Sequence, residues 1–414
     1  MLPLEGTRIV ELTTAWAGPM AGRILTWYGA ESFHIESPNR TNTWRSNRDK
    51  PNPLTYPDLD PGERPWDRCF TFNSQNVNKR SLVVDLKNPL GFSVVRRLVA
   101  MSDVLICNFR PGLLERLGLG YEKLSREQPD IIVVEMPAYG LAGPEAGYAA
   151  LGPTMEMATG MSAMISYPGG GPTVTGPSYM DPIGGFNAAA AILTALHHRD
   201  RTGLGQHIEL AQVEAAMQFI GPELIAGVDV VPDGNHLPDV APHNAYPAAG
   251  DDSWVAMAVA SDDQWAKLAR MIGGDALARD VRFSSLGARK ANEADLDRLI
   301  AGWTFDQDRH ALAARLQAAG IAASAVETAR DLVNSPYLEE RRFFTELDHP
   351  VAGRHRHPGL PLHSEIAQGS ARTAAPSYGE GNEYVLREIL ALPEAEITAI
   401  LASGAMATVP APGV

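Results

Sequence analysis

The sequence is poor in the features that define several protein classes. Its 414 residues include two cysteines, Cys69 and Cys107, too few for a disulfide framework or a thiolate zinc cluster. No apolar run approaches the roughly 18–20 residues of a membrane span, and the opening MLPLEG lacks a basic region followed by an apolar one. We therefore expect a soluble, cytoplasmic protein with no membrane partner.

Positive charge is also scarce. The formal net charge is −14, which argues against a nucleic-acid partner, because such binding needs clustered Lys and Arg. The sequence contains neither a G-x-G-x-x-G fingerprint nor a G-x-S-x-G elbow, so an NAD enzyme and a serine hydrolase are both disfavoured. A small polyanionic ligand stays open, provided that local basic residues override the overall charge.

Short apolar runs alternate with amphipathic segments in the first half of the chain. Hydrophobic residues make up 45% of the sequence, which is ordinary globular usage, and the length suggests two or three domains. Strands are predicted at 7–12, 32–36, 81–86, 104–107, 131–134 and 207–210, with helices at 18–30, 91–101 and 184–196. This alternation predicts a doubly wound α/β domain with a parallel sheet.

The remaining segments have other patterns. Residues 40–67, rich in Pro, Asn, Asp and Arg, are predicted to form a long excursion outside the core. A second unit is predicted from a strand at 254–259 and helices at 262–272, 291–303 and 309–319. Residues 335–362 are expected to be extended, residues 384–402 to form two short helices, and the chain from Ala405 onward to be frayed.

Basic residues follow two of the predicted strands. Lys87 ends one strand, Asn108-Phe109-Arg110 follows another, and Arg116 comes a turn later. Ligands of open α/β sheets collect outside the carboxyl ends of the strands, so these residues could hold the phosphates of a nucleotide-like cofactor, with Phe109 stacking on its base. Solvated strand caps are an equally good interpretation.

Asp181 is the sharpest local signal. It stands with Pro182 directly before the alanine-rich helix, a common helix start. The same position would favour an ionised carboxylate, able to attack an activated acyl group, with the backbone of Gly184 and Gly185 near a developing oxyanion. The residues alone leave both interpretations open. The run Arg354-His355-Arg356-His357 is not expected to bind metal, because its arginines would repel a cation.

Several motifs together resemble the family III CoA-transferases, also called the CaiB/BaiF family. They occur in order along the chain: LEGTRIVE at 4–11, AGP at 17–19, NKRS at 78–81, DLK at 85–87, NFRPG at 108–112, AYG at 138–140, Asp181 and RDRTGLGQ at 199–206.

This resemblance implies a fold, an assembly and a domain plan. The fold would be a large Rossmann-like domain with a smaller α/β domain, in a homodimer whose chains interlock like linked rings. The first part of the large domain would span 1–222 and the small domain 223–334. An extended linker arm would span 335–371, and C-terminal helices at 372–414 would return to the large domain.

The resemblance also implies a reaction, CoA transfer from an acyl-CoA to a carboxylic acid with no metal. Asp181 would attack the thioester to form an anhydride, and the CoA thiolate would return to form an aspartyl-CoA thioester. Either intermediate would hydrolyse in a wet site, so the family requires a dry one. The implied coenzyme A contacts are Ala17, Ser37, Val84, Asp85, Leu86, Lys87, Asn108, Phe109, Arg110, Arg116, Pro137, Ala138, Tyr139 and Gly140.

The sequence departs from the formyl-CoA transferases at three places. Trp16 and Pro137 stand where those enzymes carry Gln and Lys, and their glycine-rich loop aligns only loosely with Ala241–Asn244. A bulkier, less polar acyl group than formate or oxalate is therefore expected. Two alternatives stay open: an α-methylacyl-CoA racemase, although the Gly-His-Asp run of the racemases is replaced by Ala146–Ala149, and a non-catalytic CoA-binding subunit, against which Asp181 argues.

Overall fold

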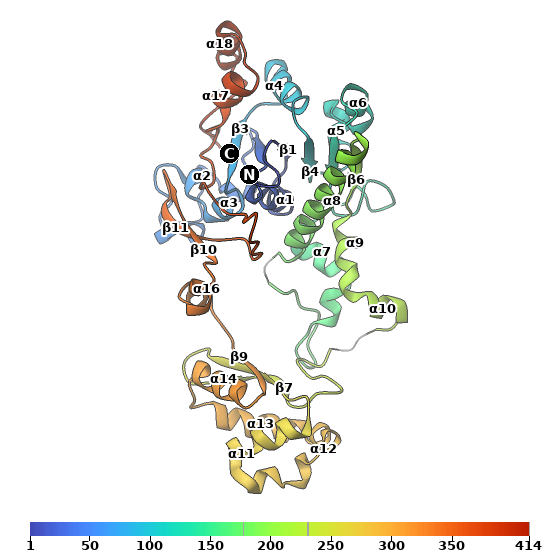
Figure 1. Ribbon diagram of the computed structural model, residues 1–414, viewed down its shortest axis with the longest axis vertical. Helices are drawn as coiled ribbons and strands as arrows, with labels where there is room; N and C mark the ends of the chain where they lie inside the picture. The colour runs from blue at the N-terminus through green and yellow to red at the C-terminus, as the bar shows by residue number, and fades with distance from the viewer. Residues whose placement is uncertain (177, 230–231, 414) are drawn as a thin grey trace. The chain divides into compact units, whose positions relative to one another are not determined.

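The computed structural model describes residues 1–176, 178–229 and 232–413 (Figure 1). It divides into two compact units. The larger unit comprises Met1–Met164, Thr173–Val230 and Glu340–Val414, and the smaller unit comprises Ile165–Pro172 and Val231–Glu339. The larger unit is therefore assembled from segments on both sides of the smaller one in the sequence. No helix among the described residues is long and apolar enough to cross a bilayer.

A parallel sheet forms the centre of the larger unit. Its strands are β1 (Arg8–Leu12), β2 (Glu31–Glu36), β3 (Lys79–Val83), β4 (Val104–Cys107), β5 (Ile132–Glu135) and β6 (Gln206–Glu209). They lie in the order β3-β2-β1-β4-β5-β6, and every neighbouring pair is parallel. The predicted α/β fold with a doubly wound sheet is confirmed. The strand order reverses between β1 and β4, which is where such sheets bind ligands.

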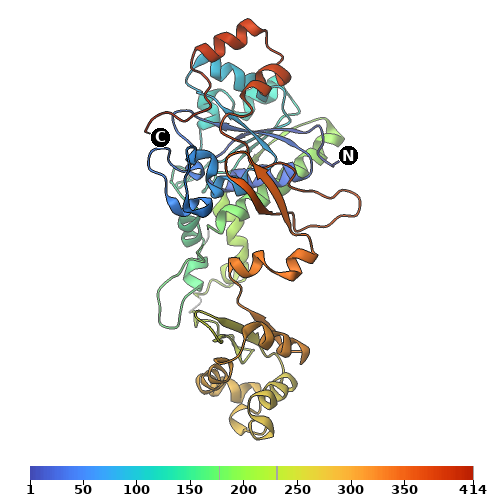
Figure 2. The ribbon, with the colours of Figure 1, turned by 90° about the vertical axis from the view of Figure 1, so that its left-hand side faces the viewer.

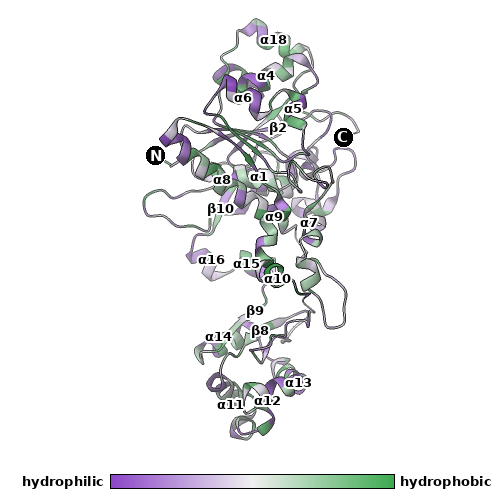
Figure 3. Ribbon diagram, turned by 90° about the vertical axis from the view of Figure 1, so that its right-hand side faces the viewer, coloured by the Kyte–Doolittle hydropathy of each residue, from purple (hydrophilic) through white to green (hydrophobic). Residues whose placement is uncertain are grey.

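Helices cover both faces of this sheet. The helices of the larger unit are α1 (Ala17–Trp27), α2 (Pro65–Arg68), α3 (Phe70–Gln75), α4 (Pro89–Val99), α5 (Leu113–Leu117), α6 (Tyr121–Glu127), α7 (Gly152–Ala158), α8 (Met180–Thr202), α9 (Gln212–Met217), α10 (Gly221–Ala226), α17 (Asn382–Tyr384) and α18 (Glu394–Ala402). One face carries α1 and α8, and the other carries α4, α5, α6 and α18 (Figure 3). Successive side chains of a strand point to opposite faces of the sheet. In β1, Ile9 packs toward α1 and α8, whereas Val10 packs toward α4.

Three segments differ from the expectation. The excursion at 40–67 reaches the core, because Arg45 is fully buried, binds Glu36 at 2.6 Å and lies over the ring of Phe72. The stretch expected to be extended contains α16 (Pro336–Glu340) and a hairpin of β10 (Phe344–His349) and β11 (Gly353–Pro358) (Figure 2). The tail is not frayed at Ala405, which is fully buried and accepts a hydrogen bond from Asp85.

The smaller unit has its own core. Strands β7 (His243–Pro247), β8 (Trp254–Ala258) and β9 (Ala322–Ala325) form an antiparallel sheet. Its helices are α11 (Asp262–Ala278), α12 (Leu286–Ala291), α13 (Glu293–Thr304), α14 (Arg309–Ala318) and α15 (Ala329–Val333). Trp265 packs edge-on against Phe283 at the centre of this core.

Candidate active site

Asp181 lies where the first turns of two helices meet. It is in the first turn of α8, and the backbone N–H of Ala17, the first residue of α1, lies near enough to its carboxylate to lower its pKa. Free N–H groups at a helix start carry partial positive charge and favour a carboxylate. Ala17, expected at the coenzyme site, therefore contacts Asp181 directly.

Burial changes the acidity of this carboxyl group. Asp181 is half-buried, and burial raises the pKa of its carboxyl group to about 6, while the two backbone N–H groups limit the rise. The carboxylate is consequently the main form at neutral pH, yet it is more basic than an exposed aspartate.

Apolar side chains surround this position. Beside Asp181, a buried cluster joins Met155 of α7, Met180 and Ile183 of α8, and Val213 and Ala216 of α9. An apolar cluster of this kind limits the access of water to the neighbouring carboxylate.

Gly152, the first residue of α7, packs directly against the carboxylate. A Cβ atom placed on Gly152 would lie 2.4 Å from Oδ2 of Asp181 and 2.5 Å from Cβ of Ser178. Only glycine fits there without displacing the carboxylate. Gly152 was not predicted from the sequence, since nothing in the sequence brings residues 152 and 181 together.

Gly184 and Gly185 occupy a different place from the one expected. They are the fifth and sixth residues of α8, and only the first four N–H groups of a helix lack an intrahelical acceptor. Their missing side chains allow close packing instead: a Cβ on Gly184 would meet Gln212 at 2.6 Å, and one on Gly185 would meet Met20 at 2.6 Å. The expectation that their N–H groups face an oxyanion is wrong for this reason.

A cavity of about 510 Å³ opens at the carboxyl ends of the central strands. We call it the strand-end cavity. Of the residues expected to contact coenzyme A, it is lined by Ser37, Val84, Asp85, Leu86, Lys87 and Phe109. Arg40 also lines it; it was not singled out because it lies in the segment expected to be outside the core.

One loop connects this cavity with Asp181. Thr13 and Thr14, which follow β1, line the cavity, and Ala17 contacts the carboxylate. Thr14 and Ala17 are three residues apart, and three residues of chain span at most about 11 Å. The strand-end cavity and Asp181 therefore lie close together, beside the point where the strand order of the sheet reverses.

The other expected coenzyme residues separate into three groups. Asn108 fixes the loop after β1: its Oδ1 accepts from Thr14 N–H at 2.9 Å and its Nδ2 donates to Thr14 O at 2.8 Å. Arg110 and Arg116 are exposed, and neither forms an ion pair within residues 1–176, 178–229 and 232–413. The stretch Pro137–Gly140 follows β5 and places Ala138 and Tyr139 against the cluster around Asp181.

A buried polar network that was not predicted from the sequence supports the same loop. The Asn42 Oδ1 atom accepts from the N–H of Ala15 at 3.3 Å, and its Nδ2 lies 3.2 Å from Nε2 of His34. Beneath them, Glu11 and Lys79 form a buried ion pair at 2.8 Å. Burial alone would raise the pKa of Glu11, but Lys79 and His34 lower it to about 2. The sequence feature that could have revealed this network is the presence of polar residues inside otherwise apolar strands.

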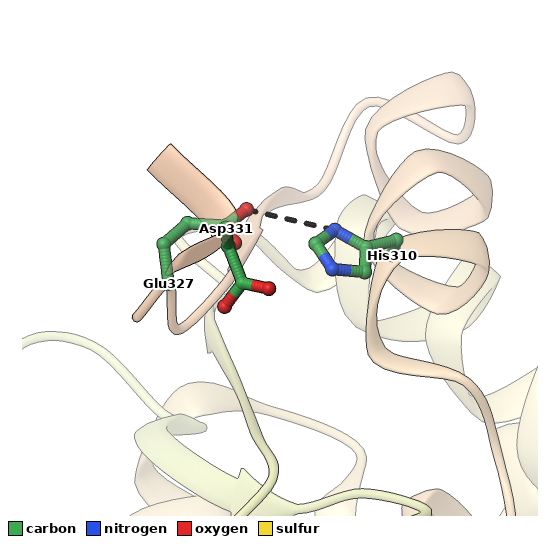
Figure 4. A group of neighbouring side chains, drawn as sticks. All are labelled: His310, Glu327 and Asp331. Atoms are coloured by element: carbon green, nitrogen blue, oxygen red, sulfur yellow. Dashed lines mark ion pairs between the residues drawn. The ribbon is translucent and has the colours of Figure 1, made fainter. Parts of the chain in front are cut away.

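A group of possible metal ligands lies in the smaller unit (Figure 4). Nδ1 of His310 is 3.5 Å from Oε1 of Glu327, with Asp331 beside them. The Asp331 carboxylate accepts a hydrogen bond from Thr328 N–H at 2.8 Å and another from Arg309 at 2.7 Å. Thr328 and Asp331 together cap the start of α15. We assign this group to capping.

Comparison with known proteins agrees with the fold and identifies the family. The profile of CoA-transferase family III matches residues 4–382. Succinyl-CoA–D-citramalate CoA-transferase of Chloroflexus aurantiacus is 31% identical over 407 residues, 97% of each chain. Succinate–glutarate CoA-transferase of Agrobacterium fabrum is 29% identical over 399 residues, 94% of this chain and 96% of the relative. The crystal structure of a CaiB/BaiF family protein from Brucella suis superposes with a TM-score of 0.84 at 29% identity, covering 94% of this chain and 99% of that one.

The fold and these relatives define the class as an acyl-CoA-handling α/β enzyme. The chain belongs to CoA-transferase family III. It is an acyl-CoA:carboxylate CoA-transferase, and its substrates are CoA thioesters and carboxylic acids. The resemblance deduced from the sequence motifs is confirmed.

Proposed function

We propose that the protein transfers CoA from an acyl-CoA to a carboxylic acid through covalent intermediates on Asp181. The carboxylate attacks the thioester carbonyl, the C–S bond breaks, and an aspartyl anhydride and CoA thiolate result. The thiolate then attacks the aspartyl carbonyl, releasing the donor acid and leaving an aspartyl-CoA thioester. The acceptor carboxylate repeats the two steps in reverse, which yields the new acyl-CoA and frees Asp181.

The position of the Asp181 carboxylate, half-buried beside an apolar cluster and near the backbone N–H of Ala17, carries this proposal. Two steps attack the carboxyl carbon of Asp181: the attack of the CoA thiolate on the anhydride, and the attack of the acceptor carboxylate on the aspartyl-CoA thioester. In both, negative charge develops on an Asp181 oxygen. A donor already aimed at that oxygen stabilises the charge without reorganisation. We therefore assign the oxyanion role to the N–H of Ala17 in place of those of Gly184 and Gly185.

Trapping tests the covalent step directly. After incubation with an acyl-CoA, hydroxylamine is expected to convert Asp181 to a hydroxamate, located by peptide mass spectrometry. Active enzyme that yields no modified peptide would contradict the mechanism. Exchange of the acyl α-proton without any acceptor acid would favour the racemase alternative, and CoA binding with neither reaction would favour a non-catalytic subunit.

The raised pKa of Asp181 predicts the pH dependence. Only the carboxylate form attacks, so kcat/KM is expected to fall as the pH is lowered through about 6. An unperturbed aspartate would give the same fall near pH 4. Initial rates between pH 4.5 and 8 in buffers of constant ionic strength measure the midpoint, and a midpoint near 4 would show that burial does not act on the catalytic group.

We propose that the strand-end cavity holds the nucleotide part of coenzyme A, with Lys87 and Arg40 beside its phosphates. The lysine is exposed at the cavity, where a charge-assisted bond to phosphate is available. Replacing Lys87 by alanine is expected to raise the KM for acyl-CoA about tenfold with kcat nearly unchanged. Lys123→Ala is the matched control, since Lys123 is also exposed but lies outside the cavity. Equal KM values in the two variants would remove Lys87 from the site.

Relatives suggest the first substrates to test. Two of them are named for succinyl-CoA or succinate with a second dicarboxylic acid. We propose succinyl-CoA as the first donor, assayed beside acyl-CoAs with longer apolar groups, because the Met-rich lining near Asp181 favours a less polar acyl group. The ratio of kcat/KM values between the two series decides the donor class.

We further propose an interlocked homodimer. Apolar side chains lie exposed on α8, on α10 and in the turn between α9 and α10: Phe186, Leu193, Phe219, Leu224 and Ile225. An apolar surface of this extent typically marks an interface. Light scattering is expected to give twice the 44.5 kDa chain mass, and a mass of one chain would contradict the proposal.

A further inference from the structure

Helix α8, which carries Asp181, begins without a side-chain cap. Within the described residues, the side chain of Tyr179 at the N-cap position makes no hydrogen bond to the first turn. The chain that leads into α8 returns to the larger unit at Thr173, after residues 165–172, which belong to the smaller unit. Contacts between this entering chain and the rest of the larger unit therefore help to decide where the first turn of α8 lies.

Glu156 of α7 holds the entering chain. Both of its carboxylate oxygens bind Thr175: Oε1 accepts a hydrogen bond from the backbone N–H at 2.8 Å, and Oε2 accepts one from the hydroxyl group at 3.0 Å. A carboxylate is a stronger acceptor than a neutral carbonyl group. We call this pair of hydrogen bonds the Glu156–Thr175 clasp.

The side chain of Glu156 is buried, which is unusual for an acidic residue. Glu156 is 1% exposed, and none of the ion pairs in the described part of the chain involves it. Burying a carboxylate without a cation is costly, so an apolar side chain would serve stability better at this position. The two hydrogen bonds to Thr175 therefore explain the carboxylate better than packing does.

The same face of α7 also reaches Asp181. Gly152 lies four residues before Glu156, about one turn along the helix, so the two positions share one face of α7. Glu156 binds Thr175 at one end of the entering chain. Gly152 packs against Ser178 and Asp181 at the other end. One face of α7 thus contacts the entering chain on both sides of the point where α8 begins.

We propose that Glu156 is a positioning residue for the transfer reaction: through Thr175 it fixes the chain that enters α8, and so orients the carboxylate of Asp181 for attack. Glu156 itself touches no reacting atom. This inference rests on the function proposed above, in which Asp181 is the nucleophile. Because orientation affects the reaction step, kcat depends on the clasp. The KM for acyl-CoA does not, because neither Glu156 nor Thr175 lines the strand-end cavity.

Two variants of Glu156 test the clasp by steady-state exchange kinetics. Glu156→Leu removes both hydrogen bonds and is expected to lower kcat about tenfold with the KM for acyl-CoA unchanged, a smaller loss than the roughly 10²-fold that a displacement of about 1 Å can cause. Glu156→Gln keeps both, because the amide oxygen accepts from the N–H of Thr175 and the amide N–H donates to its hydroxyl oxygen. It is expected to retain normal kcat. Equal kcat in Glu156→Leu and Glu156→Gln would overturn the proposal.

Thr175→Val tests the same clasp from the other side. Thr175 is exposed, and the variant loses the hydroxyl bond but keeps the backbone one. Loss of half the effect on the activation free energy gives about threefold lower kcat. Thr398→Val is the matched control: Thr398 of α18 is also exposed, and its hydroxyl donates to the carbonyl of Glu394 at 2.9 Å. Normal kcat in Thr175→Val would overturn the proposal even if Glu156→Leu failed to fold.

Hydroxylamine trapping separates a failure of this inference from a failure of the covalent mechanism. The unaltered protein and Glu156→Leu are both expected to form the hydroxamate at Asp181, more slowly in the variant. An absence of hydroxamate in the unaltered protein would overturn both proposals. Hydroxamate that forms at the same rate in the two proteins would overturn the positioning role alone.

Discussion

Asp181→Asn is expected to lower the rate of CoA exchange by at least about 10³-fold, because an amide cannot attack a thioester. Asparagine keeps the size of the side chain and an oxygen that can accept from the N–H of Ala17, so the site should keep its shape. Acyl-CoA binding should persist while the trapped hydroxamate disappears. Steady-state exchange and peptide mass spectrometry on the same preparation measure both effects.

The control for this variant is Asp200→Asn. Asp200 lies on the same helix, α8, but near its other end and exposed to solvent. It should exchange CoA at the unaltered rate. Full activity in Asp181→Asn would end the covalent proposal, whatever the control shows.

Gly152→Ala is expected to lower kcat about 100-fold while leaving the fold intact. The added methyl group would stand 2.4 Å from Oδ2 of Asp181, so the carboxylate must move by a sizeable part of an ångström or more. A displacement of about 1 Å at a reacting group can cost about 10²-fold. The KM for acyl-CoA should change little, because Gly152 is not part of the strand-end cavity.

Gly147→Ala is the matched control. Gly147 is exposed, has no heavy atom within 4 Å of a built Cβ, and is five residues away in the same segment. The two variants should unfold at similar temperatures and differ in kcat alone. If Gly152→Ala retains normal kcat, the carboxylate is not held where the structure places it.

The larger domain could be predicted from the sequence because its signals are local. Apolar runs such as 104–107 and 131–134 form buried strands with helices between them, and their alternation fixes a parallel sheet. The same rule places Ser37, Lys87 and Phe109 at strand carboxyl ends, and these residues line one cavity. Asp181 was found because a helix start leaves a recognisable pattern of residues.

The errors arose where contacts join distant segments. Gly184 and Gly185 were expected to present free N–H groups, but they lie inside α8 and let Met20 and Gln212 approach it. A composition rich in Pro and Arg predicted an exposed excursion at 40–67. Arg45 is nevertheless buried there, because Glu36 and Asp67 neutralise its charge from other elements.

The amino-acid order by itself determined the fold class, the family motifs and the identity of the acidic residue at the start of α8, since each depends on residues close together in the chain. The tertiary structure alone decided the surroundings of that residue. The backbone N–H of Ala17 lowers its pKa and Gly152 limits its position, and both lie far from residue 181 in the sequence. The raised pKa has the same origin, because burial is produced by packing and no local pattern of residues encodes it.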